Sequence, residues 1–165
     1  MGGVIVEVEA YDGDDPASHG FRGKTRGNAS MFGPPGRAYV YRSYGVHWCL
    51  NLVCGEEGVA EAALVRALEP QSGVERMKGR RGLDNERLLC SGPGRLTQAL
   101  AITGAYDGLP LDATPLHLTA RNGDVQVCAS PRIGLTRAVE APWRYTLGRS
   151  RFLSRPVPGA SRRRA

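Results

Sequence analysis

The chain has 165 residues and a mass of 17.7 kDa, a size that suits one domain with a single buried core. Lysine and arginine outnumber aspartate and glutamate by 22 to 16, which gives a net charge of +6. The sequence has no apolar run of roughly 18 residues and no secretory signal at M-G-G-V-I-V-E, so we expect neither a membrane protein nor an exported one.

Nearly all of the positive charge is arginine, because Lys24 and Lys78 are the only lysines. Arginine matches phosphate geometry and stacks on bases, so this bias favours a nucleic-acid partner. A GC-rich genome would produce the same bias without any function behind it. Composition therefore leaves both interpretations open.

Cysteine and histidine residues give no sign of a metal site. The chain has Cys49, Cys54, Cys90, Cys128, His19, His47 and His117. The cysteines form no C-x-x-C pair and lie among apolar residues, while the histidines are scattered. We therefore expect reduced, buried thiols in a cytosolic protein and no bound metal.

The first predicted element is a strand over residues 4–11, in which apolar residues alternate with Ile5, Glu7, Glu9 and Tyr11. A period of two places alternate side chains on opposite faces, so two carboxylates and a tyrosine share one face. Carboxylates are depleted in strands and need an explanation. A solvated edge strand is one explanation, and a catalytic face is the other.

A β-hairpin is the next predicted element, after a loop-like stretch over residues 12–36. Its strands cover residues 38–43 and 46–53, and Tyr44-Gly45 forms a tight tip. An odd number of residues in the connecting loop would place Tyr41 and Asn51 on the same face, and an even number would separate them. If both line one pocket, the loop must be odd or carry a bulge.

Aromatic residues are concentrated in this hairpin. Any one of them can be explained by packing within a sheet. Tyr44 is harder to explain in this way, because a hairpin tip is exposed. Arg37 and Arg42 flank it, and basic charge interleaved with aromatic rings suits contact with nucleic-acid bases.

The remaining predicted elements are a strand, two helices and three short strands. The strand covers residues 62–68, the helices cover residues 74–80 and 93–102, and the short strands cover residues 116–119, 125–129 and 144–147. Ser91 is the expected cap of the second helix. This order predicts a mixed domain of the α+β class around a largely antiparallel sheet.

Seven motifs follow one another along the chain in a characteristic order. They are Glu9-Ala-Tyr11, His19, Met31-Phe32-x-x-Pro35-Gly36, Tyr39-Val40-Tyr41-x-x-Tyr44-Gly45, Cys49-x-Asn51, Arg66-Ala67-x-Glu69-Pro70 and Cys90-Ser91-Gly92-Pro93. As an ordered set they resemble the alkyladenine DNA glycosylase (3-methyladenine DNA glycosylase) family, from about residue 5 to residue 156. The resemblance implies a single domain over residues 1–156, with a curved sheet, flanking helices and a protruding hairpin.

The function implied by this resemblance is base-excision repair. Such an enzyme hydrolyses the N-glycosidic bond of 3-methyladenine, 7-methylguanine or hypoxanthine, after the nucleotide has been extruded from the duplex. The implied partner is double-stranded DNA with damaged purines, bound by a monomer in the bacterial cytoplasm at the nucleoid. No cofactor, metal or membrane is implied. The alternative from another class is a catalytically impaired module that only binds DNA lesions.

The resemblance also assigns a base pocket and a wedge. Tyr11, His19 and Tyr41 match the aromatic walls around the extruded base, and Asn51 matches the side chain that rejects the amino group of guanine. Tyr44 matches the residue that intercalates into the duplex and fills the gap.

The catalytic base implied by the resemblance is Glu9. Periodicity alone leaves Glu7 as a rival, so the choice rests on the match through Ala10 and Tyr11. Arg66 matches the residue that helps to hold the water and the carboxylate, although a structural ion pair explains an arginine there equally well. Ile133 matches the position whose backbone carbonyl contacts the water. With no lysine near Glu9, we expect a monofunctional glycosylase without strand cleavage.

Two expectations concern the ends of the chain. The family has a helix and a strand before the catalytic strand, and this sequence begins almost at that strand, so we expect a truncated start or a short form. Residues 157–165 include Arg162, Arg163 and Arg164, and we expect a disordered basic tail there.

Overall fold

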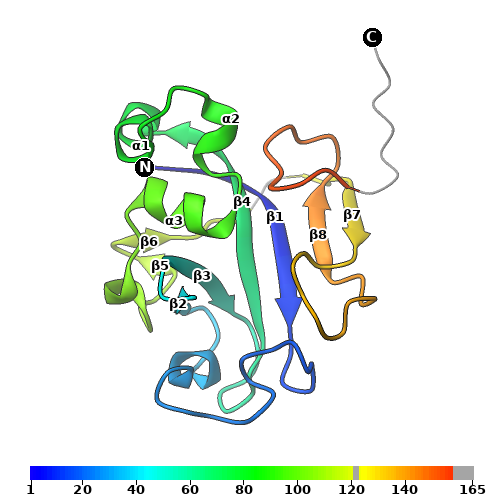
Figure 1. The fold of residues 1–165 in the computed structure, drawn as a ribbon. Coiled ribbons are helices and arrows are strands. Elements are labelled where there is room, and N and C mark those ends of the chain that lie inside the picture. The colour runs from blue at the N-terminus through cyan, green and yellow to red at the C-terminus, as the bar shows by residue number, and fades with distance from the viewer. Residues whose placement is uncertain (121–122, 158–165) are drawn as a thin grey trace.

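Six antiparallel strands form one curved sheet in the order β2-β3-β4-β1-β8-β7 (Figure 1). A computed structural model describes residues 1–120 and 123–157 of the chain. The strands are β1 Gly2–Tyr11, β2 Ala38–Ser43, β3 His47–Val53, β4 Ala62–Ser72, β7 Val127–Ser130 and β8 Arg144–Leu147. β1 lies between β4 and β8, so the interpretation of its acidic residues as those of an edge strand is wrong.

Three short helices follow β4 along the chain and pack together on one side of the sheet (Figure 1). They are α1 Val74–Arg81, α2 Glu86–Leu89 and α3 Pro93–Leu100, and the smaller elements are 3₁₀ turns at Ala29–Phe32 and Gly104–Tyr106 and a two-stranded ribbon of β5 Asp112–Ala113 and β6 Leu116–His117. The largest buried apolar cluster joins these helices to the sheet through residues such as Val65, Met77 and Leu96. The structure confirms the predicted α+β class.

The strand over residues 4–11 carries bulges next to Glu7 that the predicted regular alternation did not include. Register shifts against β4 occur on both sides of Glu7, and such bulges interrupt the period of two. As predicted, the neighbours Ile5 and Val6 point to opposite faces, since Ile5 packs with the helix-side cluster and Val6 packs with Ala67 and Phe152. Glu7 and Glu9 nevertheless reach the same arginine, Arg66.

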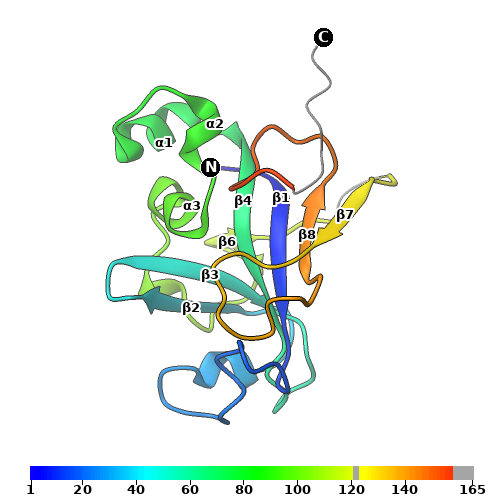
Figure 2. The ribbon, with the colours of Figure 1, turned by 45° about the vertical axis from the view of Figure 1, so that its right-hand side comes forward.

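The hairpin of β2 and β3 leaves the main sheet after a short pairing with β4 and extends to one side of it (Figure 2). Ser43 pairs with His47, so the loop has three residues, one more than the predicted tip. Tyr44 and Gly45 have φ values of 49° and 67°, and both are positive as in a type I′ turn. Because the loop is odd, the register condition for Tyr41 and Asn51 is met.

Two predicted boundaries are corrected by local geometry. β4 continues through Pro70 to Ser72, because β3 pairs with β4 only at residues 62–64 and the proline needs no N–H donor on that side. α3 is preceded by Gly92 at φ 143°, with Pro93 in its first turn, and Ser91 instead contacts Arg95. The helix ends at Leu100, since Ala101 adopts a left-handed conformation.

Other predicted features agree with the structure in part. β8 and α1 lie where they were predicted, while α2 and β5 were not predicted. The cysteines are free, and Cys49 and Cys90 are buried as expected, but Cys54 is exposed and Cys128 is only half-buried. The expected basic tail lies outside the described residues from position 158 onward. Among the helices that are described, we find none that is long and apolar enough to cross a membrane.

Candidate active site

A cavity of about 670 Å³ opens between the hairpin, the end of β1 and the segment that follows β7. Its size is typical of small-molecule sites. It brings together residues that are up to 144 positions apart in the chain, from Tyr11 to Arg155. Its lining includes Tyr11, His19, Tyr39, Tyr41, Tyr44, Asn51, Arg66 and Ile133. All but one of the predicted site residues therefore line this single cavity.

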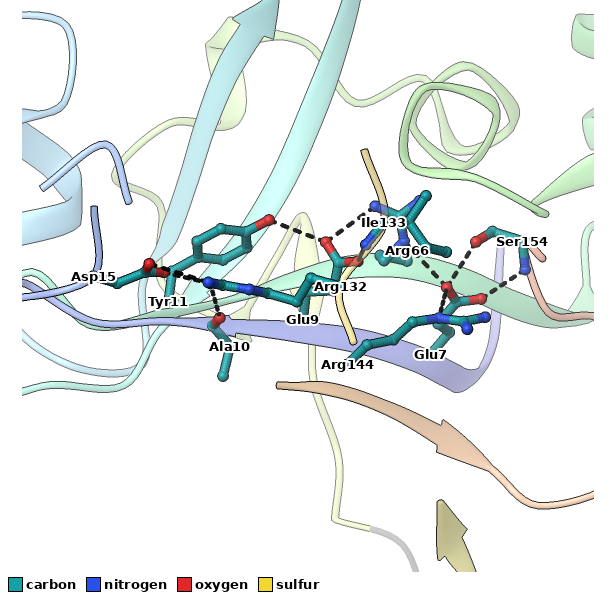
Figure 3. Close-up of polar contacts among 10 residues, drawn as sticks. All are labelled: Glu7, Glu9, Ala10, Tyr11, Asp15, Arg66, Arg132, Ile133, Arg144 and Ser154. Atoms are coloured by element: carbon teal, nitrogen blue, oxygen red, sulfur yellow. Dashed lines mark hydrogen bonds and ion pairs between the residues drawn. The ribbon is translucent and has the colours of Figure 1, made fainter. Parts of the chain in front are cut away.

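The remaining predicted residue, Glu9, lies directly behind the cavity wall and is fully buried. Three groups that line the cavity donate hydrogen bonds to its carboxylate (Figure 3). The Tyr11 hydroxyl donates to Oε2 at 3.0 Å, Arg66 Nη1 donates to Oε2 at 3.1 Å, and the Ile133 amide donates to Oε1 at 2.7 Å. A carboxylate that accepts from three donors is held in one orientation.

Tyr11 acts as a donor to this carboxylate. Burial and the neighbouring charge of Glu9 raise the pKa of the Tyr11 hydroxyl above its usual range, so the phenol keeps its proton. Ile133 was predicted to act through its carbonyl, whereas its N–H is the group that contacts Glu9. A contact between the carbonyl and a water stays a prediction.

Glu7 has a different environment from Glu9. It accepts hydrogen bonds from Arg66 Nε at 3.1 Å and Arg144 Nε at 2.9 Å, and from the amide and hydroxyl of Ser154 at 2.6 and 2.7 Å (Figure 3). These bonds join β1 to β4, β8 and the C-terminal segment. Glu7 thus orients Arg66 from the side away from Glu9, and the two carboxylates are no longer equivalent.

Burial alone would raise the pKa of Glu7, but hydrogen bonds from Arg144 and Ser154 and the charge of Arg144 outweigh it and lower the pKa. A lowered pKa in the folded state stabilises the protein above the unfolded value of about pH 4.3, and this stability is lost as the pH falls through the folded value. We therefore expect the free energy of unfolding to fall below about pH 4, more steeply for the wild type than for Glu7→Gln. Urea denaturation between pH 7 and pH 2.5 measures this, and parallel curves would contradict it.

Aromatic rings form one wall of the cavity. Tyr39 and Tyr41 stack with ring centroids 5.5 Å apart, and His19 meets the Tyr41 ring at 4.3 Å in an edge arrangement. Nδ1 of His19 lies 2.9 Å from the Tyr39 hydroxyl. Burial lowers the pKa of His19, which favours the neutral imidazole. Tyr39 was not predicted as a site residue, although its spacing of two from Tyr41 places it on the same face.

Asn51 lies opposite Tyr39 in the hairpin register. It is 5% exposed, and its Nδ2 donates to the Tyr39 carbonyl at 3.0 Å. This bond leaves the side-chain oxygen of Asn51 as an acceptor at the cavity. That Asn51 lies close to Tyr39 in the hairpin could be predicted from the sequence, while the deep burial of Asn51 could not.

Tyr44 lies at the rim of the cavity and is 93% exposed. No neighbour explains its position, since the turn projects it into solvent.

An ion pair between Asp15 and Arg132 lies beneath Tyr11 and was not predicted from the sequence. Both side chains are fully buried. The two residues are 117 positions apart, and only the return of the chain after β7 brings them together.

Among residues 1–120 and 123–157, no group of three His, Cys, Asp or Glu side chains could hold a metal ion.

Comparison with known proteins decides the family. The model of the methylpurine-DNA glycosylase family matches residues 1–151. The chain belongs to this family. A curated relative from Rhodopseudomonas palustris strain HaA2 is 60% identical over 156 residues, which cover 94% of this chain and 78% of the relative. Its name is "Putative 3-methyladenine DNA glycosylase".

Relatives of the same name occur in other genera. The protein of Bradyrhizobium diazoefficiens is 57% identical over 96% of this chain and 79% of its own length, and that of Nitrosospira multiformis is 56% identical over 94% and 81%. Membership in the methylpurine-DNA glycosylase family confirms the resemblance of the motifs and the general class, a DNA glycosylase of repair. The roles of individual residues in the cavity stay predictions.

Proposed function

We propose that this methylpurine-DNA glycosylase hydrolyses the N-glycosidic bond of alkylated or deaminated purines in double-stranded DNA, with residues 1–156 as the catalytic domain. The observation that carries the proposal is Glu9, a buried carboxylate held by Tyr11, Arg66 and Ile133 directly behind an aromatic cavity. We assign to this carboxylate the role of the general base.

In the proposed reaction, the bond between the sugar carbon and the base nitrogen breaks, and its electron pair leaves with the base. The oxygen of a water forms the new bond to the sugar carbon, and Glu9 takes the proton of this water. Positive charge develops on the sugar, and the carboxylate stabilises it. Arg66, held by Glu7, positions Glu9, and the Ile133 carbonyl is the proposed second contact of the water.

The base would occupy the cavity between Tyr11, Tyr41 and His19. An alkylated purine such as 3-methyladenine or 7-methylguanine carries a positive charge, so aromatic faces attract it by about 1–2 kcal/mol in a desolvated site. Hypoxanthine lacks this charge and relies on stacking and shape. Asn51, fixed by its bond to Tyr39, would exclude the amino group of normal guanine.

A purine within a duplex cannot reach Glu9, so the nucleotide must be extruded. Tyr44 is the proposed wedge, because it is almost fully exposed at the cavity rim.

A second cavity of about 910 Å³ shares Arg66, His47 and Arg155 with the first. Arg81 and Arg95 also line it, and this concentration of arginine suits the phosphates of the DNA backbone.

The Tyr44→Ser variant tests the wedge. We expect unchanged thermal stability, because the side chain is exposed, and at least a tenfold weaker affinity for a duplex with an extruded lesion. Affinity for undamaged duplex should fall less than threefold. Fluorescence of a base analogue at the lesion position measures extrusion, and equal losses for both duplexes would contradict the wedge.

Single-turnover release of hypoxanthine and 3-methyladenine from a damaged duplex tests the function itself. We expect the wild type to release base without cutting the strand, and to show no dependence on added metal. The competing function is a module that binds lesions without catalysis. Tight binding of the damaged duplex with no release of any base would support that module and refute the enzyme.

A further inference from the structure

The Arg132 guanidinium lies against the Tyr11 ring, with its central carbon 4.5 Å from the ring centroid. The same carbon lies 5.0 Å from the Trp143 ring. Both terminal nitrogens of Arg132 bond to Asp15, one of them at 3.0 Å to Oδ1, and Nη1 also donates to the Ala10 carbonyl at 2.9 Å. The Arg132 side chain has no exposed surface. Figure 3 shows it beneath Tyr11, reaching toward Asp15 and Ala10.

Tyr11 separates this cation from the cavity. The Tyr11 ring lines the cavity, while the Arg132 side chain is wholly buried behind it. A tyrosine ring presents negative electrostatic potential on both of its faces. A guanidinium on one face therefore opposes the attraction of a second cation on the other face.

The charge behind Tyr11 acts differently on the two kinds of damaged purine. A cationic alkylated purine is repelled while it is bound, and it becomes neutral when it leaves with the electron pair of the glycosidic bond. A neutral purine such as hypoxanthine gains negative charge as it leaves with that electron pair. Positive charge behind Tyr11 thus opposes binding of the cationic base and stabilises the departure of the neutral one.

We propose that the Asp15–Arg132 ion pair behind Tyr11 sets the selectivity of the base pocket between cationic and neutral damaged purines. Arg132 is a positioning residue, because it acts through Tyr11 and touches no reacting atom. Asp15 limits the effect by neutralising most of the charge. The proposal rests on the proposed glycosylase function, and it assigns to this pair a role that the motifs around Glu9 do not include.

The size of the effect follows from distance. A base stacked at about 3.5 Å on the cavity face of Tyr11 would lie about 8 Å from the guanidinium. At an effective dielectric constant of about 20, one uncompensated charge at that distance changes an equilibrium roughly tenfold or more. The compensated pair has a smaller effect of about two- to fivefold.

The test compares two single variants that change the charge in opposite directions. Asp15→Asn leaves the arginine charge uncompensated, and Arg132→Gln removes it while keeping an amide donor for Asp15 and Ala10. The measured quantity is the second-order rate constant for release of 7-methylguanine divided by that for hypoxanthine from the same duplex. We expect this ratio to fall about tenfold in Asp15→Asn and to rise about tenfold in Arg132→Gln.

A purely structural role would slow both substrates together and leave the ratio unchanged. The double variant Asp15→Asn/Arg132→Gln keeps a neutral hydrogen-bonded pair and replaces a single variant that does not fold. We expect it to raise the ratio of the two rate constants by about two- to fivefold. Trp143→Leu is the control, because it removes a ring from Arg132 without changing charge, and its ratio should stay within twofold.

Three outcomes are distinguishable. Opposite shifts in the two single variants support the proposal, and so does the smaller rise in the double variant. An unchanged ratio, or shifts in the same direction, would overturn it while leaving the glycosylase function in place. If the wild type releases neither base, the proposed function itself fails, and this proposal fails with it.

Discussion

The Glu9→Gln variant is expected to release damaged purines at least about 10³-fold more slowly than the wild type, because an amide cannot take a proton from water. Glutamine has nearly the same shape as glutamate, so binding of the damaged duplex should change less than threefold. Arg66 keeps its contact with Glu7, and the fold should therefore survive the change. Single-turnover release and a binding titration with the same duplex measure both quantities.

The matched control is Glu57→Gln, which makes the same change of charge on an exposed loop. It should release base at the wild-type rate. Release by Glu9→Gln within tenfold of the wild type would show that another group is the base. Glu7 would then be the first candidate, since it shares Arg66 with Glu9.

The second large effect is expected on stability, from Glu7→Gln. Glu7 is 1% exposed and accepts bonds from Arg66, Arg144 and Ser154. Removing one partner of a buried ion pair leaves the other charges uncompensated, at a cost of about 3–5 kcal/mol in the free energy of unfolding. Urea denaturation at pH 7 measures this loss.

Glu75→Gln is the matched control for stability. Glu75 pairs with Lys78 at 2.8 Å on the surface of α1, and exposed pairs of this kind contribute little. We expect its unfolding curve to overlay that of the wild type. A loss below about 1 kcal/mol in Glu7→Gln would mean that the network around Glu7 does not hold β1, β4 and β8 together.

The two glutamate variants should therefore separate two roles within one pair of residues. Glu9→Gln is expected to be stable and inactive, whereas Glu7→Gln is expected to be unstable, with activity that falls only as Arg66 loses its support. This contrast addresses the ambiguity left by the sequence, in which both carboxylates were assigned to one face of one strand.

Local patterns predicted much of the framework. The hairpin over β2 and β3 followed from two β-rich runs around Tyr44-Gly45, whereas the shared face of Tyr41 and Asn51 was left conditional on the loop length, which the structure decided. These predictions succeed because side-chain direction in a strand depends only on the position of a residue in the pleat. The prediction of Ser91 as the cap of α3 is wrong. Gly92 precedes this helix with a φ of 143°, and the neighbouring motifs did not reveal this backbone conformation.

The sequence by itself determined most of the larger elements, the ordered motifs and hence the family, because these depend on neighbours along the chain. Only the tertiary structure decided what Glu7 and Glu9 each contact. Ile133, Arg144 and Ser154 reach these carboxylates from 124 to 147 positions away. The same is true of Asp15 and Arg132 behind Tyr11. The charge and solvation around a carboxylate depend on groups a few ångströms away in space, and no pattern within one strand contains them.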